Sequence, residues 1–325
     1  MNRAVQKTAL ITGIRGQDGS YLAELLLAKG YQVIGTSHRT DKNFHSMLGD
    51  AELKVERLDL SSATEVRDIV ATVKPHEVYN LAARSSSAQL FDDPIATAEI
   101  NGIAAVRFLE AIREVSPDTR FCQAASSEVF AGTDISPQDE STAYRPVNAY
   151  GAAKTFAANM VTAYRVRHGL YATTAILFNH ESPRRSMDYV TRKITHTVAR
   201  IALGQADSLM LGNLDSRRDW GFAGDYARAM WLMMQRTTPD DYVIATGETH
   251  SVREFCDIAF SHVGLDHRDF VHIDSQWARR TETVELCGNP TKIKECLDWQ
   301  PSVSFKELVR TMVDADLALL NSNSN

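Results

Sequence analysis

The chain has 325 residues, of which 44% are hydrophobic and 23% are charged, and its formal net charge is −6. This length suits two fused lobes with a sizeable core, and the composition is that of an ordinary globular enzyme. The acidic balance argues against nucleic acid or an anionic membrane surface as the main partner, so we expect neither.

The first half of the chain alternates short β-branched runs with helical patterns. Strands are predicted at 8–12, 32–36, 53–58, 76–83, 120–125 and 173–178. Helices are predicted at 20–29, 61–73 (with Ser61 as its N-cap), 95–115 and 148–168. This alternation predicts an α/β fold with a doubly wound parallel sheet of the Rossmann type, formed mainly by residues 1–180.

After about residue 180 the alternation gives way to single helices and arginine-rich segments. One strand, near 241–246, is expected to return to the main sheet. Residues 289–320 are predicted to form a helix, a loop and a second helix. We therefore expect residues 181–325 to form mainly a smaller substrate lobe, interleaved with the first domain and closing over it.

A glycine-rich segment follows the first predicted strand and opens the first helix. Gly13, Gly16 and Gly19 have the spacing that allows a tight turn, close approach to a pyrophosphate and close helix packing. Together with Gln17 and Asp18, they are predicted to bind a dinucleotide at the start of the helix.

The end of the second strand bears on the choice of dinucleotide. An NAD site usually has an acidic residue there, whereas this chain has His38 and Arg39. Arg39 is predicted to bind the 2′-phosphate of NADP, with a solvated arginine as the alternative. Four strand-end residues are expected to flank the adenine or line the path to the nicotinamide: Asp59, Leu60, Leu81 and Ala83.

Four residues in two neighbouring segments predict redox and acid–base chemistry. Tyr150 and Lys154 are four positions apart, which places both on one face of a helix. An ammonium close to a phenol is expected to lower the tyrosine pKa toward working pH. Ser126, at the end of its strand, can donate to the same substrate oxygen. Glu128 adds a carboxylate that simple oxidation does not need, which indicates proton removal beside a new carbonyl.

The cysteines and the N-terminal sequence bear on metals and location. The four cysteines have no CxxC spacing, so we predict neither a metal site nor a redox pair. No apolar run reaches the length of a membrane span, and no signal peptide is recognised. We expect the protein in the cytoplasm.

The motifs described above resemble those of the extended short-chain dehydrogenase/reductase superfamily. Within that superfamily, the second half of the chain resembles the GDP-mannose 4,6-dehydratase family. The most specific segment is Leu-Phe-Asn-His-Glu-Ser-Pro-Arg-Arg at 177–185. Segments 8–22, 190–194, 211–221 and 289–294 also match, so the resemblance covers nearly the whole chain. It implies a hydro-lyase that reduces and reoxidises NADP within one turnover, converts GDP-mannose to GDP-4-keto-6-deoxymannose and serves surface polysaccharide assembly.

The resemblance also implies roles for individual residues. Ser126, Glu128, Tyr150 and Lys154 would be catalytic. Nucleotide-sugar contacts are expected at Asn179, Lys193, Arg218, Arg279 and Glu282, with Ser85 and Ser86 near the hexose. His180 is expected to be a structural hydrogen-bonding residue. Family members are usually homo-oligomers, so we expect a homodimer or a homotetramer.

Two departures from the family pattern keep alternatives open. Ala83-Arg84-Ser85-Ser86 stands where typical members have Ala-Gln-Ser-His, and Phe130-Ala131 where they have Tyr-Gly. The smaller Ser86 motivates an alternative substrate, GDP-manno-heptose, giving a 6-deoxy-4-keto-heptose. A weaker alternative is a 4-ketoreductase or epimerase acting on a GDP-sugar, and Glu128 argues against it. A regulator without turnover would usually lack Tyr150 or Lys154.

Overall fold

The centre of the molecule is a seven-stranded sheet in which all strands are parallel. The computed structural model describes residues 6–38, 53–85, 93–274 and 285–322. The strand order is β11-β6-β5-β4-β1-β2-β3. The strands are β1 (Thr8–Thr12), β2 (Gln32–Ser37), β3 (Lys54–Arg57), β4 (Glu77–Asn80), β5 (Arg120–Ser126), β6 (Ala172–Leu177) and β11 (Tyr242–Ile244). This confirms the predicted doubly wound parallel fold.

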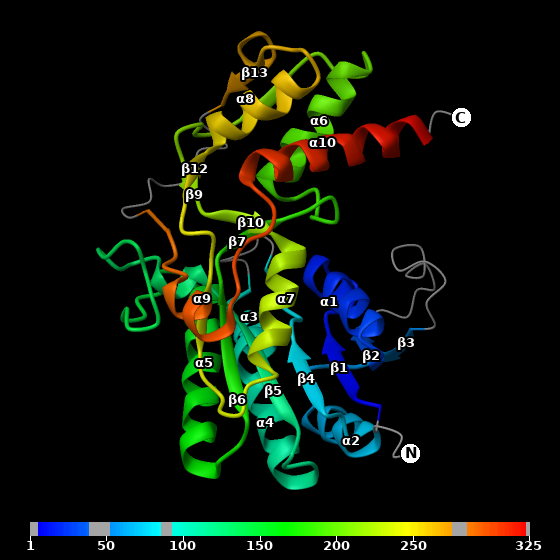
Figure 1. The fold of residues 1–325 in the computed structure, drawn as a ribbon, viewed down its shortest axis with the longest axis vertical. Helices are drawn as coiled ribbons and strands as arrows, with labels where there is room; N and C mark the ends of the chain where they lie inside the picture. The colour runs from blue at the N-terminus through cyan, green and yellow to red at the C-terminus, as the bar shows by residue number, and fades with distance from the viewer. Residues whose placement is uncertain (1–5, 39–52, 86–92, 275–284, 323–325) are drawn as a thin grey trace.

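Helices cover both faces of this sheet. On one face lie α1 (Gln17–Ala28), α7 (Ala223–Met233) and α9 (Thr291–Leu297), and on the other α2 (Ala63–Val73), α4 (Ala104–Val115) and α5 (Ala149–His168). Successive strand residues serve opposite faces: Ile11 belongs to the apolar cluster with α1, and Leu10 to the cluster with α2 and α4. Helix α7, strand β11 and helix α9 come from the second half of the chain but pack onto this sheet (Figure 1).

Helix boundaries differ from the predictions in three places. Helix α1 begins at Gln17, three residues earlier than predicted, so it starts within the glycine-rich segment and includes Gly19. Ser62, not Ser61, caps α2, because the Ser62 hydroxyl accepts a hydrogen bond from Glu65 N at 3.2 Å. The helix predicted at 95–115 is divided into α3 (Pro94–Ala98), the π-helical turn η2 (Glu99–Ile103) and α4.

Strand β4 ends at Asn80, three residues before its predicted end. Beyond it, the backbone N–H groups of Leu81 and Ala82 both donate to the Thr12 hydroxyl, each at 3.0 Å. Thr12 is the last residue of β1, and its hydroxyl donates to Asn80 Oδ1 at 2.8 Å. The chain therefore leaves the strand ladder at Asn80 and turns beside the end of β1.

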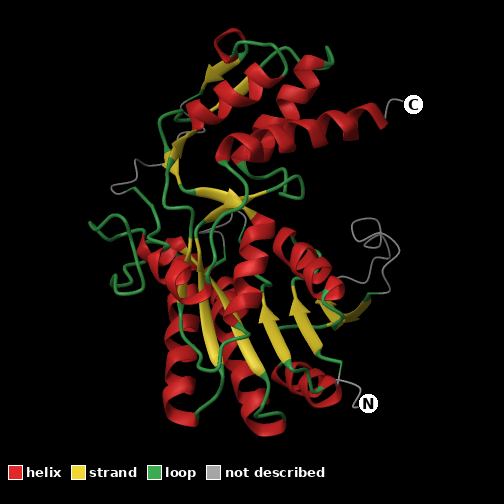
Figure 2. Cartoon of the chain, in the orientation of Figure 1, coloured by secondary structure: helices red, strands yellow, loops and turns green. Residues whose placement is uncertain are grey.

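A third apolar cluster lies beyond the carboxyl ends of the sheet strands. It is formed mainly by α6 (Val190–Ala202), α8 (Val252–His262) and α10 (Phe305–Ser322). Figure 2 shows that the main strands run toward this cluster. Ligands of open α/β sheets bind beyond the carboxyl ends of the strands, so the cluster lies on the side of the sheet where a ligand site is expected. Helices α9 and α10, with the segment between them, confirm the helix, loop and helix predicted for 289–320.

Short strands connect the two parts. Strand β7 (Asn179–Glu181) pairs with β10 (Trp220–Phe222), and β9 (Arg217–Arg218) with β12 (His250–Ser251). Strand β8 (Leu209–Leu211) pairs with β13 (Val271–Ile273) at the far end of the smaller part. Two short 3₁₀ turns complete the described elements: η3 (Ser127–Phe130) after β5, and η4 (His267–Asp269) after α8.

Candidate active site

The glycine-rich turn packs too closely for side chains. Gly13 has a φ of +67°, and a Cβ there would lie 2.9 Å from the backbone of Ala82. A Cβ at Gly19 would lie 2.7 Å from the Cα of Ile14 and closer still to the carbonyl oxygen of Gly13. Gly16, at the N-cap of α1, has no side chain to cap the helix, so the positive end of α1 can face a phosphate. This cradle fits a dinucleotide pyrophosphate.

The side chains of Gln17 and Asp18 are held by the protein itself. Gln17 donates to the carbonyl of His180 at 3.0 Å and accepts from the Ser182 hydroxyl at 2.8 Å. Asp18 Oδ1 lies 2.9 Å from His180 Nε2, and His180 Nδ1 lies 2.7 Å from the carbonyl oxygen of Phe178. This confirms the structural role expected for His180. The contacts join the start of α1 to the Asn-His-Glu-Ser-Pro-Arg-Arg segment.

The Asp18–His180 pair is electrostatically strong. Burial alone would raise the pKa of Asp18, but the charge and hydrogen bond of His180, with Arg185, hold it at about 2. Burial lowers the pKa of His180, but Asp18 outweighs that effect and raises it. The pair therefore carries opposite charges over a range of mildly acidic pH.

The remaining predicted cofactor residues lie along the ends of β3 and β4. Asp59 accepts from Ser61, at 2.9 Å from N and 2.7 Å from Oγ, and these hydrogen bonds lower its pKa. Leu60 is buried in the cluster under α2 and α4, so it supports the site from below. Leu81 and Ala83 are half-buried after β4. Arg39 lies outside the described residues.

The four predicted catalytic residues meet at the end of β5. Ser126 is the last residue of β5, Glu128 lies in η3, and Tyr150 and Lys154 lie in α5. Ser126 forms a side-chain hydrogen bond with Tyr150, and its hydroxyl also accepts from Glu128 N at 3.3 Å. Two segments about two dozen residues apart thus form one polar cluster beside the glycine-rich turn.

The pKa of Tyr150 is raised, not lowered as expected from its spacing to Lys154. Lys154 is buried, donates to the carbonyl of Ala124 at 2.7 Å and lies 5.8 Å from the centre of the Tyr150 ring. Burial raises the pKa of Tyr150 above its usual value, and the hydrogen bond with Ser126 and the charge of Arg185 offset this only in part. Burial likewise lowers the pKa of Lys154 to about 8. Desolvation outweighs charge attraction here.

Arg185 was missed as an individual site residue. Its Nε lies 3.1 Å from Glu181 Oε2, and its guanidinium carbon lies 3.4 Å from the centre of the Tyr189 ring. The positive charge of Arg185 offsets part of the rise in the pKa of Tyr150, which is the effect expected of Lys154. The sequence showed only a basic pair, Arg184-Arg185, and the available signal was its place in the specific 177–185 segment.

The predicted substrate residues lie on neighbouring elements of the smaller part. Asn179 begins β7, and Arg218 ends β9, where its Nη1 donates to the carbonyl of Arg217 at 2.6 Å. Lys193, on α6, donates to the carbonyl of Met210 at 2.7 Å. Ser85 accepts from the Tyr189 hydroxyl, at 2.6 Å on its carbonyl and 3.2 Å on its Oγ. Ser86, Arg279 and Glu282 lie outside the described residues.

Other basic residues of this part form ion pairs within the protein. Arg192 is buried, and its Nη2 lies 2.6 Å from Asp316 Oδ1. Arg184 pairs with Glu24 on α1. Arg217 pairs with Glu285, with a distance of 3.0 Å from Nε to Oε1. In the described part of the chain, one residue of each basic pair at 192–193 and 217–218, and both residues of the pair at 184–185, thus form ion pairs within the protein.

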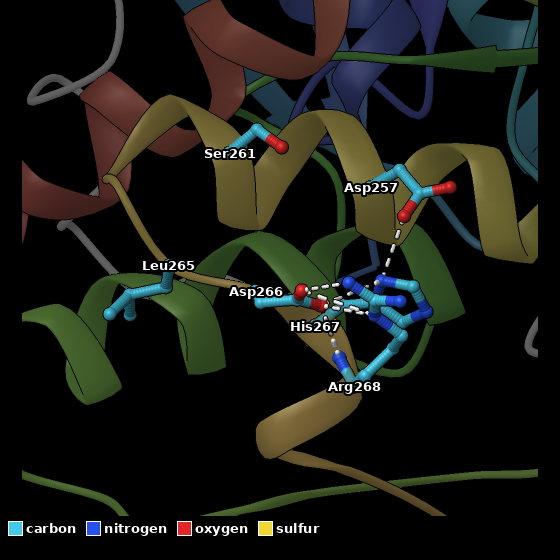
Figure 3. Close-up of a pocket in the computed structure, with 6 residues that line it drawn as sticks. All are labelled: Asp257, Ser261, Leu265, Asp266, His267 and Arg268. Carbon is cyan, nitrogen blue, oxygen red and sulfur yellow. Dashed lines mark hydrogen bonds and ion pairs between the residues drawn. The ribbon is translucent and has the colours of Figure 1, made fainter.

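A polar pocket lies elsewhere, between α8 and η4 (Figure 3). Its polar lining residues pair with one another: His267 Nδ1 lies 2.7 Å from Asp257 Oδ1, and Arg268 Nη2 lies 2.5 Å from Asp266 Oδ2. None of the predicted site residues lines it. The candidate active site is therefore the cluster at the end of β5, not this pocket.

The sheet and its flanking helices have the Rossmann-type fold of extended short-chain dehydrogenases/reductases. UDP-glucose 4-epimerase from Thermotoga maritima has the same fold, with a TM-score of 0.85 at 22% identity, over 96% of this chain and 99% of that one. A dTDP-glucose 4,6-dehydratase from Bacillus anthracis, solved in complex with NAD, gives a TM-score of 0.82 at 18% identity, over 95% and 96% of the two chains.

The sequence comparisons are more specific than the fold. The family model described as GDP-mannose 4,6 dehydratase matches residues 10–312. GDP-mannose 4,6 dehydratase 1 of Arabidopsis thaliana is 47% identical over 329 aligned positions, which span 97% of this chain and 91% of the relative. The chain belongs to the GDP-mannose 4,6-dehydratase family.

Two features are absent from the part of the chain that the structure describes. Within that part of the chain, no helix has both the length and the apolar character needed to cross a bilayer. In the same ranges, no group of three or more His, Cys, Asp or Glu side chains is arranged to hold a metal ion.

Proposed function

We propose that this chain dehydrates GDP-mannose to GDP-4-keto-6-deoxymannose, with a nicotinamide dinucleotide reduced and reoxidised within each turnover. The family match supports this activity. The single structural observation that carries it is the convergence of Ser126, Glu128 and Tyr150 at the end of β5, beside a glycine-rich turn. Oxidation alone would need no Glu128, whereas elimination of water needs such an acid–base group.

The proposed steps use the residues of this cluster. The bound dinucleotide would accept a hydride from C4 and later return it to C6. Tyr150 takes the proton of the C4 hydroxyl, and Ser126 donates a hydrogen bond to that oxygen. Glu128 removes the proton at C5, which the neighbouring ketone has made acidic, and then protonates the C6 hydroxyl as it leaves as water. When the hydride has returned to C6, the proton that Tyr150 took in the first step would return to C5, so that the net change is the loss of one water. Tyr150 must lose its proton although burial raises its pKa, so Arg185 and Lys154 would stabilise the phenolate.

The preference for NADP over NAD is part of the proposal. The backbone of the turn around Gly13, Gly16 and Gly19 would hold the pyrophosphate, and Arg39 would bind the 2′-phosphate. Asp59, Leu81 and Ala83 would line the rest of the cofactor site, and the buried Leu60 would pack beneath them. The absence of an acidic residue directly after β2 supports NADP, because an acid there would bind the ribose hydroxyls of NAD.

The substrate lobe would bind the GDP part. We propose Asn179, Lys193 and Arg218 as contacts, together with Arg279 and Glu282, which lie outside the described ranges and which the family resemblance implies. Ser85 and Ser86 would lie near the hexose. Burial lowers the pKa of Lys193, which suits a cation that is partly withdrawn from water near a phosphate.

We divide the chain accordingly into a cofactor domain and a substrate lobe. Residues 1–180 with β11 would bind the cofactor, and 181–325 mainly the nucleotide sugar, although α7 and α9 pack on the first domain. We further propose a homodimer or homotetramer in the cytoplasm, and its four free cysteines suit a reducing compartment. Light scattering after gel filtration tests the oligomer, and a monomer at working concentration would contradict it.

The experiment compares sugars and cofactors in one format. Purified protein is incubated with GDP-mannose or GDP-manno-heptose, each with NADP or NAD, and products are followed by mass spectrometry. We expect loss of one water from GDP-mannose, fastest with NADP, without accumulation of reduced cofactor. A much higher rate on the heptose would replace mannose as the substrate. Interconversion of sugars without loss of water would instead indicate a reductase or epimerase.

A further inference from the structure

Asn148 bridges the two catalytic segments. It directly precedes α5 and is two residues before Tyr150. Its Oδ1 accepts a hydrogen bond from Gly151 N at 2.7 Å and so caps the helix. Its Nδ2 donates to Glu128 Oε2, also at 2.7 Å. One side chain therefore contacts the carboxylate of Glu128 and the first turn of the helix that carries Tyr150.

The helix cap fixes the orientation of this amide. A backbone N–H needs an acceptor, so the oxygen of Asn148 must face Gly151 and the nitrogen must face the opposite side. Glu128 lies on that side. An aspartate could cap the helix equally well but would present an acceptor to Glu128. A serine could cap it but lacks the second polar group.

Glu128 is also constrained through its backbone. Its N–H donates to the Ser126 hydroxyl at 3.3 Å. Its carbonyl oxygen lies against Gly151 so closely that a Cβ there would be 2.6 Å away. The turn η3 thus packs directly on the start of α5. The hydrogen bond from Asn148 adds control of the carboxylate itself and engages only one of its two oxygens, Oε2.

We propose that Asn148 is a positioning residue that fixes the position of the Glu128 carboxylate relative to Tyr150. This proposal rests on the proposed function, in which Tyr150 acts at C4 and Glu128 acts at C5 and C6 of the same sugar. Tyr150 acts on the hydroxyl of C4, and Glu128 acts on the proton of the adjacent carbon, C5. A small displacement of the Glu128 carboxylate would therefore slow elimination strongly, while oxidation at C4 would continue. By fixing this position, Asn148 would allow elimination across C5 and C6 to follow oxidation at C4 without delay.

The test uses substitutions that separate the cap from the hydrogen bond to Glu128. Asn148→Ser and Asn148→Asp both keep a good N-cap, and Asn148→Ala removes it. Asn148→Ser deletes the amide donor, and Asn148→Asp replaces it with a second carboxyl group. Melting temperatures report on the cap. Single-turnover absorbance of the reduced nicotinamide and deuterium exchange at C5 report on the coupling of the two steps.

We expect Asn148→Ser to melt close to the wild type but to dehydrate GDP-mannose at least about tenfold more slowly, with little change in KM. Reduced cofactor should accumulate transiently, because oxidation at C4 outpaces elimination. Asn148→Asp should be slower still at neutral pH, where two carboxylates repel. Relative to the wild type it should recover as the pH falls, since a protonated carboxyl can donate the missing hydrogen bond.

Glu128→Gln is the reference variant that separates the positioning role of Asn148 from the proposed role of Glu128 in dehydration. If Glu128→Gln abolishes dehydration while Asn148→Ser and Asn148→Asp behave as the wild type, the positioning role is wrong and the proposed function stands. If Glu128→Gln still dehydrates GDP-mannose, the role of Glu128 itself is wrong. A defect confined to Asn148→Ala, with a lower melting temperature, would reduce Asn148 to a helix cap and overturn the proposal.

Discussion

The ion pair between Asp18 and His180 gives a stability effect with a defined pH window. The pKa of Asp18 falls from 3.8 to about 2 in the folded protein. Each pKa unit corresponds to about 1.4 kcal/mol, so ionised Asp18 contributes about 2 kcal/mol to the free energy of unfolding. Asn at this position keeps the shape but removes the charge. We expect Asp18→Asn to lose about that amount.

The two partners limit the window from opposite sides. Asp18 has a lowered pKa, so its contribution is present above 3.8 and is lost as the pH falls through 3.8 toward about 2. His180 has a raised pKa, so its contribution is present below 6.5 and is lost as the pH rises through its folded pKa. The difference between wild type and Asp18→Asn should therefore be largest between about pH 4 and 6.5.

Urea unfolding at about pH 3, 5 and 9 measures this difference directly. We expect about 2 kcal/mol at pH 5 and clearly less at pH 3 and pH 9. Asp68→Asn, at an exposed position of α2, is the matched control and should change little at any of the three. A difference that does not vary with pH, or none at pH 5, would refute the electrostatic reasoning.

Three further predictions follow from the packing. Gly19→Ala should weaken dinucleotide binding at least about tenfold in a fluorescence titration, because a Cβ would clash with the turn backbone; unchanged affinity would mean that the turn can relax. Asp219→Asn should lower the free energy of unfolding by about 1–3 kcal/mol in urea, because the buried carboxylate accepts from Thr246, Gly247 and Gly288 and an amide cannot satisfy all of them; equal stability would show that the amide is accommodated. Of the four thiols, Cys296 should react first with a maleimide, since it is exposed while Cys122 and Cys256 are buried and burial raises the pKa of Cys287 to about 11; mass spectrometry of digests identifies the modified residue, and earlier labelling of Cys122 would contradict the packing.

Local sequence patterns were enough to predict the main sheet and the clustering of the four candidate catalytic residues. Each main strand reads as a short β-branched or apolar run, and the position of Ser126 follows from the end of β5. The spacing of Tyr150 and Lys154 places them on one helix face whatever surrounds them. These features depend on residues close in the chain, so they could be read without the fold.

The features that could not be predicted from the sequence depend mainly on contacts between residues far apart in the chain. The π-helical turn at Glu99–Ile103 does not interrupt the apolar pattern that predicted one long helix. The pKa of Tyr150 depends on burial and on Arg185, both of which are properties of the assembled site. The bridge from Asn148 to Glu128 joins residues twenty positions apart, and no pattern of spacing announces it. Ser61 and Ser62 are equally good caps by type, and only the hydrogen bond from Glu65 distinguishes them.

The central claim is that the hydride removed from C4 returns to C6 of the same sugar. GDP-mannose labelled with deuterium at C4 tests this directly, with NADP bound and the product analysed by NMR. The account predicts that deuterium appears at C6 of the 4-keto-6-deoxy product and does not build up in the free cofactor. Deuterium retained in reduced cofactor, with no product lacking one water, would contradict it.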